Sequence, residues 1–332
     1  MKRCFYAGIL PIPSEVKSHL QANSIELTMN PQGHILSEEE LLRLLPGFDA
    51  AVAGVEPYTE RVMAACPNLK VIARTGVGYD KVDIEAATRR GILVTWTPIP
   101  ELSYTIAEQT FALILSFLKR IPELSKSTRE GTWSRTNGSL EIEDLYPKTL
   151  GLLGLGRIGA EVARRAKSYR MNLIYHDTVR MENLEEELGI RYVSFDELLS
   201  AADIISIHAP LTPETKGLIN DGSIRKMKKT AIIVNTARGA IIDEQALAQA
   251  LTENRLRGAL LDVLSEEPPS EKHVFFKLGD RIPNLVITPH MAHGPDTIRA
   301  MALSAVDDVI RVLNGQPPKY LLNKEVLEGH RD

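Results

Sequence analysis

Short runs of Val, Ile, Leu and Ala alternate along the chain with stretches whose apolar residues recur at helical spacing. The first strand set comprises the N-terminal segment and residues 50–54, 69–73 and 92–95, and helices are expected at 37–45, 60–65 and 82–90. The second strand set comprises residues 149–154, 172–176, 203–208, 231–235, 259–263 and 285–288. These runs are apolar on both faces, as buried parallel strands are. The alternation predicts an α/β protein with two doubly wound parallel sheets.

Two long helical patterns lie at the borders of the second strand set. One covers residues 104–118 and the other covers 295–314, where Gly315 and the pair Pro317 and Pro318 end it. A chain of 332 residues has room for two domains. We therefore expect a nucleotide domain at 101–291, inserted into a first domain formed by 1–100 plus 292–332.

Composition narrows the classes of function. The 39 basic and 43 acidic residues give a net charge of −4, so the chain lacks the basic surface of a nucleic-acid-binding protein. No apolar run approaches the roughly 18 residues that span a bilayer, and the apolar N-terminal run is a first strand rather than a signal peptide. Cys4 and Cys66 have no CxxC companion, which favours reduced thiols in a cytoplasmic protein. No metal-binding cluster is expected.

The strongest single motif is GLGRIG, which follows the apolar run 149–153 and opens a helical pattern. Gly154 permits a tight turn, Gly156 lets the backbone approach a pyrophosphate, and Gly159 lets the helix pack closely on the strand. Eighteen residues later, Asp177 ends the next strand, where a carboxylate binds ribose hydroxyls. Its charge would repel a 2′-phosphate, so we expect NAD rather than NADP as the cofactor.

Three residues with complementary chemistry follow the later strands. Arg238 follows 231–235, Glu267 follows 259–263 and His290 follows 285–288. The carboxyl ends of parallel strands meet at one edge, so these side chains should converge. An arginine can bind a carboxylate, a histidine can exchange a proton, and a carboxylate beside that histidine stabilises its charged form. Taken singly, the three could be a surface arginine, a loop acid and a loop histidine.

Several longer segments resemble the D-2-hydroxyacid dehydrogenase family, especially short forms similar to D-3-phosphoglycerate dehydrogenase. They are ARTGVGYDKVD (73–83), TIAEQT (105–110), KTLGLLGLGRIG (148–159), ISIHAPLTPETKGLIN (205–220), MKKTAIIVNTARGAIIDEQAL (227–247), LDVLSEEP (261–268) and ITPH (287–290). The resemblance implies a Rossmann nucleotide domain inserted into a flavodoxin-like substrate domain. It also implies reversible hydride transfer between NAD(H) and a small 2-keto or 2-hydroxy acid.

The resemblance also assigns individual residues. It implies Arg238, Glu267 and His290 as the catalytic set, and Arg74, Val77, Gly78 and Arg238 as substrate ligands. Beyond the three glycines and Asp177, the implied cofactor residues are Arg157, Ile158, His208, Ala209, Pro210, Thr215, Thr236, Ala237, Arg238, Asp262 and His290. The chain ends at Asp332, so we do not expect the C-terminal regulatory domain of longer phosphoglycerate dehydrogenases.

Alternatives on the same fold stay open at this point. They are D-3-phosphoglycerate dehydrogenase itself, an NAD(H)-sensing protein similar to the C-terminal binding protein corepressors, and, less favoured because of Glu267, a formate dehydrogenase. Arg74 stands where phosphoglycerate dehydrogenases contact the substrate phosphate, but residues 52–59 lack a second arginine and carry Glu56. A dianion would be poorly matched there, so we expect an unphosphorylated substrate. The apolar helix 104–118 and the resemblance together predict a homodimer.

Overall fold

The computed structural model describes residues 1–9, 12–133 and 142–328. The chain divides into two compact units, Met1–Leu102 with His293–Asp332 and Ser103–Ala292. Each contains one parallel β-sheet, of five and of seven strands, and we name the units after these sheets. The predicted fold class, with two parallel α/β domains, is confirmed.

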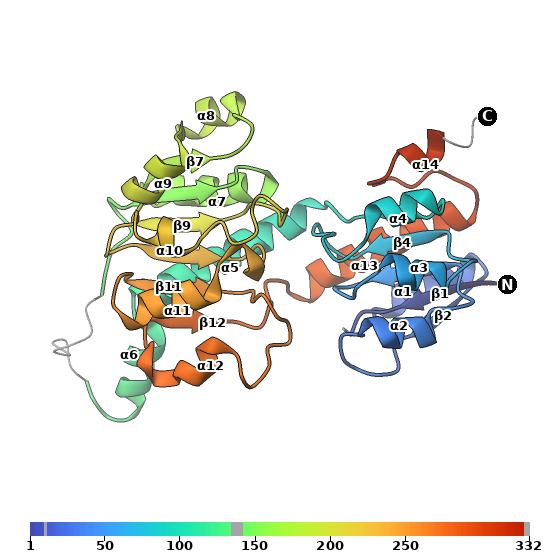
Figure 1. The fold of residues 1–332 in the computed structure, drawn as a ribbon, viewed down its shortest axis with the longest axis horizontal. Helices are drawn as coiled ribbons and strands as arrows, with labels where there is room; N and C mark the ends of the chain where they lie inside the picture. The colour runs from blue at the N-terminus through green and yellow to red at the C-terminus, as the bar shows by residue number, and fades with distance from the viewer. Residues whose placement is uncertain (10–11, 134–141, 329–332) are drawn as a thin grey trace. The chain divides into compact units, whose positions relative to one another are not determined.

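The five-stranded unit has the strand order β2-β1-β3-β4-β5, the order of flavodoxin-like sheets. Its strands are β1 (Lys2–Tyr6), β2 (Ile25–Met29), β3 (Ala50–Ala53), β4 (Val71–Arg74) and β5 (Leu93–Thr95). One face packs on α1 (Ser14–Ala22) and α13 (Pro295–Leu313). The other face is covered by α2 (Glu38–Leu44), α3 (Glu60–Ala64) and α4 (Ile84–Arg89), and α14 (Glu325–Glu328) lies near the C-terminus (Figure 1).

The seven-stranded unit has the order β12-β11-β10-β9-β6-β7-β8, which is a Rossmann sheet extended by one strand. Its strands are β6 (Thr149–Leu153), β7 (Asn172–His176), β8 (Arg191–Tyr192), β9 (Ile204–Ile207), β10 (Ile232–Asn235), β11 (Gly258–Leu261) and β12 (Leu285–Ile287). One core contains α5 (Pro100–Leu118), α7 (Arg157–Ser168) and α8 (Glu182–Leu188). The opposite core contains α9 (Phe195–Ala201), α10 (Asp221–Ile224), α11 (Glu244–Thr252) and α12 (Val274–Leu278). Helix α6 (Ile121–Arg129) has no buried residue.

Two edge strands were not predicted. Only the first residue of β2 is fully buried, and β8 has two residues, so neither leaves a strong apolar pattern. The stretch before the predicted helix 104–118 also differs from expectation, since α5 already begins at Pro100. Proline is well tolerated in the first turn of a helix, where its missing N–H has no helical acceptor.

The apolar residues on more than one face of α5 have an explanation inside the seven-stranded unit. Four large side chains of α5 are each at most 5% exposed, namely those of Phe111, Leu113, Ile114 and Phe117. A Cβ atom on Gly258 would lie 2.5 Å from the Phe117 ring, so the helix approaches β11 closely. These residues therefore fill the core of their own unit, and the pattern that suggested a dimer contact at α5 does not require one.

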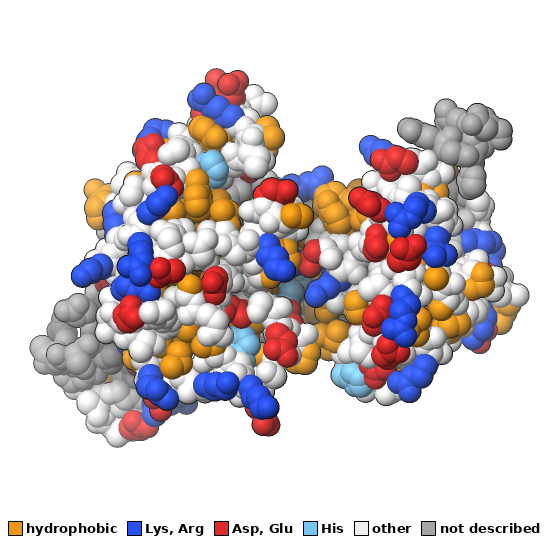
Figure 2. Space-filling model, in the orientation of Figure 1, with side chains coloured by type: hydrophobic (Ala, Val, Ile, Leu, Met, Phe, Trp, Pro, Cys, Tyr) orange, Lys and Arg blue, Asp and Glu red, His pale blue; other side chains and the backbone are white. Residues whose placement is uncertain are grey.

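Acidic and basic side chains are interspersed on the face shown in Figure 2. None of the described helices is long and apolar enough to cross a membrane.

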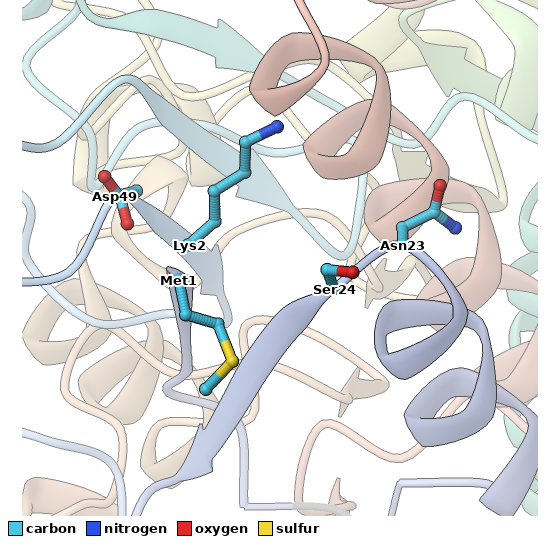
Figure 3. Close-up of a pocket in the computed structure, with 5 residues that line it drawn as sticks. All are labelled: Met1, Lys2, Asn23, Ser24 and Asp49. Atoms are coloured by element: carbon cyan, nitrogen blue, oxygen red, sulfur yellow. The ribbon is translucent and has the colours of Figure 1, made fainter.

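A hollow at the surface of the five-stranded unit is lined by Met1, Lys2, Asn23, Ser24 and Asp49 (Figure 3). These residues lie at the amino ends of β1, β2 and β3, opposite the carboxyl edge where ligands bind in such sheets.

Candidate active site

The turn between β6 and α7 depends on glycine. Gly154 has φ +95°, and a Cβ there would lie 2.8 Å from the amide nitrogen of Ala209. A Cβ on Gly159 would lie 2.3 Å from the carbonyl oxygen of Gly154. Gly156, the N-cap of α7, faces open space. The first turn of α7, with Arg157 and Ile158, thus presents an accessible helix N-terminus suited to an anion.

Asp177 and His208 flank this turn from neighbouring strands. The Oδ2 atom of Asp177 accepts the N–H of Leu155 at 2.8 Å, which fixes the carboxylate beside the glycines. The Nε2 atom of His208 pairs with the Ser206 hydroxyl at 2.8 Å, whereas its buried Nδ1 has no partner within the described chain. Burial lowers the pKa of His208 to about 3, so its ring is neutral near pH 7.

Two further residues of the predicted cofactor site, Thr215 and Thr236, follow β9 and β10 and have hydrogen-bonded hydroxyl groups. Thr215 donates its hydroxyl to the carbonyl of Pro210 at 2.7 Å and accepts the N–H of Thr212. Beyond β10, the hydroxyls of Thr236 and Thr110 lie 3.1 Å apart.

The side chain of Asn235 shapes the turn that carries Ala237 and Arg238. This residue is fully buried, accepts the Ala237 N–H at 3.0 Å and donates to the Arg238 carbonyl at 2.9 Å. Nη1 of Arg238 donates to the carbonyl of Ala237 at 2.8 Å.

His290 and Glu267, from the loops after β12 and β11, are bonded to each other. Nδ1 of His290 lies 2.7 Å from Oε2 of Glu267, and Oε1 of the same carboxylate accepts the N–H of Leu264 at 2.9 Å. Burial disfavours the charged carboxylate. Nearby groups outweigh this effect and lower the pKa of Glu267. They are the hydrogen bond and charge of His290, the N–H of Leu264 and the charge of Arg238. The structure therefore brings the predicted arginine, acid and histidine into one electrostatic cluster.

Asp262 organises the loop that carries His290. This residue is 1% exposed, and its Oδ1 accepts hydrogen bonds from the Thr288 hydroxyl, from the Met291 N–H at 3.2 Å and from Nε2 of Gln109 at 3.3 Å. Its carbonyl accepts the N–H of His290 at 2.8 Å. These contacts hold His290 at φ +55°, a left-handed conformation that is uncommon outside glycine.

The same carboxyl group has a raised pKa. Burial is the main cause, and the bonds from Thr288 and Met291, the charge of His290 and the bond from Gln109 oppose it. Gln109 also donates to the Thr288 hydroxyl at 3.1 Å, so α5 supports this loop as well. Sequence reasoning did not single out Gln109, although it lies in the TIAEQT segment.

In the five-stranded unit, Arg74 supports the loop after β4. Its Nε donates to the Gly78 carbonyl at 2.8 Å, and its Nη1 donates to the Ala53 carbonyl at 3.0 Å. Glu56 is 2% exposed and accepts the Gly54 N–H at 2.7 Å. Burial raises the pKa of Glu56, while backbone N–H groups and the charge of Arg74 oppose the shift. Within the described residues, the N–H groups of Val77 and Gly78 have no acceptor.

Comparisons with known proteins bear on this arrangement. The family model for "D-isomer specific 2-hydroxyacid dehydrogenase, NAD binding domain" matches residues 111–292, more than half of the chain. This chain belongs to that family. It is an NAD-dependent D-2-hydroxyacid dehydrogenase, an oxidoreductase that acts on a CH–OH group of a small hydroxy acid.

Three relatives illustrate the range of the family. Glyoxylate reductase of Korarchaeum cryptofilum is 39% identical over 88% of this chain and 88% of that protein. D-3-phosphoglycerate dehydrogenase of Archaeoglobus fulgidus is 38% identical over 96% of this chain but 59% of that protein. The structure of D-lactate dehydrogenase from Aquifex aeolicus, complexed with NAD and lactic acid, aligns with TM-score 0.83 and 28% identity over 99% and 98% of the two chains.

The geometry fits the NAD that the family binds. Four features lie at one edge of the sheet. They are the open space beside Gly156, the N-terminus of α7, the fixed carboxylate of Asp177 and the Nδ1 atom of His208, which has no partner among the described residues. A pyrophosphate needs the first two features, and ribose hydroxyls need an acceptor such as Asp177. The buried His208 nitrogen is the kind of orphaned polar atom that a bound ligand satisfies.

Gly239, which follows Arg238, has no room for a side chain. A Cβ there would lie 1.9 Å from the carbonyl carbon of Leu264 and 2.2 Å from the nitrogen of Ser265, so Gly239→Ala must displace the Arg238 segment or the Glu267 loop. We expect a lower melting temperature and a kcat for 2-keto acid reduction reduced about 10²-fold, the cost of an ångström-scale misplacement. Gly294→Ser is the control, since a Cβ there meets nothing within 4 Å and serine is a favourable N-cap for α13. Wild-type kcat and melting temperature in Gly239→Ala would contradict the close contact.

Proposed function

We propose that this enzyme interconverts glyoxylate, or a similarly small unphosphorylated 2-keto acid, with its 2-hydroxy acid. The observation that carries the proposal is the surroundings of Arg74. The guanidinium supports two backbone carbonyls and lies in the field of buried Glu56, so it is a poor ligand for a phosphate dianion. The glyoxylate reductases among its relatives, including that of Korarchaeum cryptofilum, support the same substrate class.

The proposed roles follow the contacts within each unit. Arg238 binds the substrate carboxylate and carbonyl, because its guanidinium can make two parallel hydrogen bonds to oxygen. In the five-stranded unit, which we propose as the substrate domain (1–100 plus 292–332), the N–H groups of Val77 and Gly78 bind a carboxylate. The nucleotide domain is proposed as 101–291. The cofactor, when bound, would accept the hydride as NAD⁺ and supply it as NADH.

His290 is the proposed acid and base. Its Nδ1 is bonded to Glu267, which leaves Nε2 to exchange a proton with the substrate oxygen. During keto-acid reduction Nε2 protonates the oxygen as negative charge develops there, and during oxidation it takes the hydroxyl proton. Glu267 stabilises the imidazolium and fixes the ring. Asp262 holds the backbone of His290 in place.

A substrate panel tests the proposed specificity. We expect glyoxylate, or another unphosphorylated 2-keto acid, to show the highest kcat/KM with NADH. A higher kcat/KM for 3-phosphohydroxypyruvate than for every unphosphorylated acid would overturn the proposal. D-3-phosphoglycerate dehydrogenase would then be the better description.

His290→Ala tests the acid and base. We expect kcat for keto-acid reduction to fall about 10²–10⁴-fold, the usual cost of losing general acid–base catalysis. NADH binding, measured by fluorescence titration, should stay within a few-fold, because the imidazole acts on the substrate oxygen. Retention of more than half of the wild-type kcat, with the chemical step limiting the rate, would assign the proton transfer to another group.

Cofactor choice tests Asp177. We expect kcat/KM with NAD to exceed that with NADP by at least ~10-fold, since the carboxylate would face a 2′-phosphate. The nearby Arg180 is held by Glu185 through two hydrogen bonds of 2.9 and 2.8 Å. Asp177→Ala should narrow the preference, and Asp196→Ala, at an exposed carboxylate on α9, is the control. Equal use of both cofactors by the wild type would refute the role of Asp177.

We also propose a cytoplasmic homodimer. Both cysteines are buried and free, as in proteins of reducing compartments. Between α5 and β6 the side chains of Ile121, Trp133, Ile142 and Tyr146 are each more than half exposed, which is unusual for large apolar groups without a partner. Sedimentation equilibrium at micromolar concentration should give twice the 36.8 kDa of one chain. A mass of one chain would contradict the dimer.

A further inference from the structure

Glu244, the first residue of α11, is bonded to both ends of the loop that carries Glu267. Its Oε1 accepts the N–H of Ser265 at 2.8 Å, and its Oε2 accepts the Ser265 hydroxyl. The same Oε2 lies 3.0 Å from Nε2 of His273. Its side chain is only 10% exposed, and that of His273 is 5% exposed. One buried carboxylate therefore closes the loop between Ser265 and His273.

The histidine at the far end is oriented by its own helix. His273 is the N-cap of α12, and its Nδ1 accepts the N–H of Phe275 at 3.4 Å. With Nδ1 accepting, the ring proton lies on Nε2 and is donated to Glu244. Glu244 thus receives three donors, and the start of α12 is joined to the start of α11.

The Ser265 end of the loop lies beside Arg238 and Glu267, two members of the proposed catalytic set. The peptide between Leu264 and Ser265 packs against Gly239, the residue after Arg238. Leu264 also donates its N–H to Glu267. A shift of Ser265 would therefore move the loop relative to Arg238 and carry Glu267 away from His290.

We propose that Glu244 is a positioning residue of this dehydrogenase, which holds the 264–273 loop so that Glu267 keeps its hydrogen bond to His290. The inference rests on the proposed roles of Glu267 and His290. Glu244 is bonded to Ser265 and His273 and forms no hydrogen bond or ion pair with Glu267 or His290, so its effect on the reaction passes through the loop backbone.

The test compares Glu244→Ala and Glu244→Gln with Glu267→Gln. The measurements are kcat and the pH dependence of kcat/KM for glyoxylate reduction with NADH, the Kd of NADH by fluorescence, and the melting temperature. Glu271→Gln is the control, because it removes the same charge from an exposed position in the same loop.

Keto-acid reduction needs His290 in its protonated form, so activity falls as the pH rises. In Glu267→Gln the protonated ring loses its neighbouring negative charge, and this fall in activity should begin at a lower pH. We expect Glu244→Ala to shift the basic limb of the pH profile in the same direction. It should also lower kcat about 10–100-fold, since a misplacement of up to an ångström can cost about 10²-fold. The Kd of NADH should change less than about threefold. Glu244→Gln should retain part of the wild-type kcat, since its carbonyl oxygen can still accept from Ser265.

A second comparison separates positioning from a purely structural role. In the Glu267→Gln background, Glu244→Ala should cost little further kcat, because the carboxylate that it positions is already absent. A wild-type pH profile in both Glu244 variants, or a full additional loss in the double variant, would overturn the proposal. If Glu244→Ala does not fold, the profile of Glu244→Gln decides alone. An unchanged profile in Glu267→Gln itself would instead refute the proposed role of Glu267.

Discussion

The hydrogen bond between His290 and Glu267 is the interaction on which the candidate site depends. Each partner lies in a loop after a different strand, and each is held by further hydrogen bonds besides the one that joins them. Asp262 fixes the backbone of His290 in a left-handed conformation. The N–H of Leu264 fixes the carboxylate of Glu267. The 2.7 Å contact is thus preorganised by the fold, as efficient acid–base chemistry requires.

Parallel strand order explains why residues far apart in sequence meet. Strands β10, β11 and β12 are neighbours in one sheet, so their carboxyl ends present Arg238, Glu267 and His290 at one edge. Glycine then permits the close approach of the connecting segments. Gly239 has no space for a Cβ beside Leu264, and Gly159 has none beside Gly154. The edge that we propose for NAD therefore also carries the residues that we propose for proton transfer.

Much of this could be predicted from the sequence, because the relevant signals are local. The glycine turn, the strand-end position of Asp177 and the apolar strands all appear in short windows. The edge strands β2 and β8 could not be predicted, since their burial pattern is weak. The internal packing of α5 depends on Gly258 and a distant strand. The contacts of Gln109 and Glu244 join residues more than twenty positions apart, so no motif spacing indicates them.

The most direct test of the account is a double-mutant cycle between His290 and Glu267, measured on kcat for 2-keto acid reduction. If Glu267 acts by stabilising and orienting His290, Glu267→Gln should lower kcat in the wild-type background and have almost no effect in His290→Ala, because residues that act as a unit are strongly non-additive. If the two losses in kcat multiply as independent effects, the pair is not the functional unit that the structure indicates.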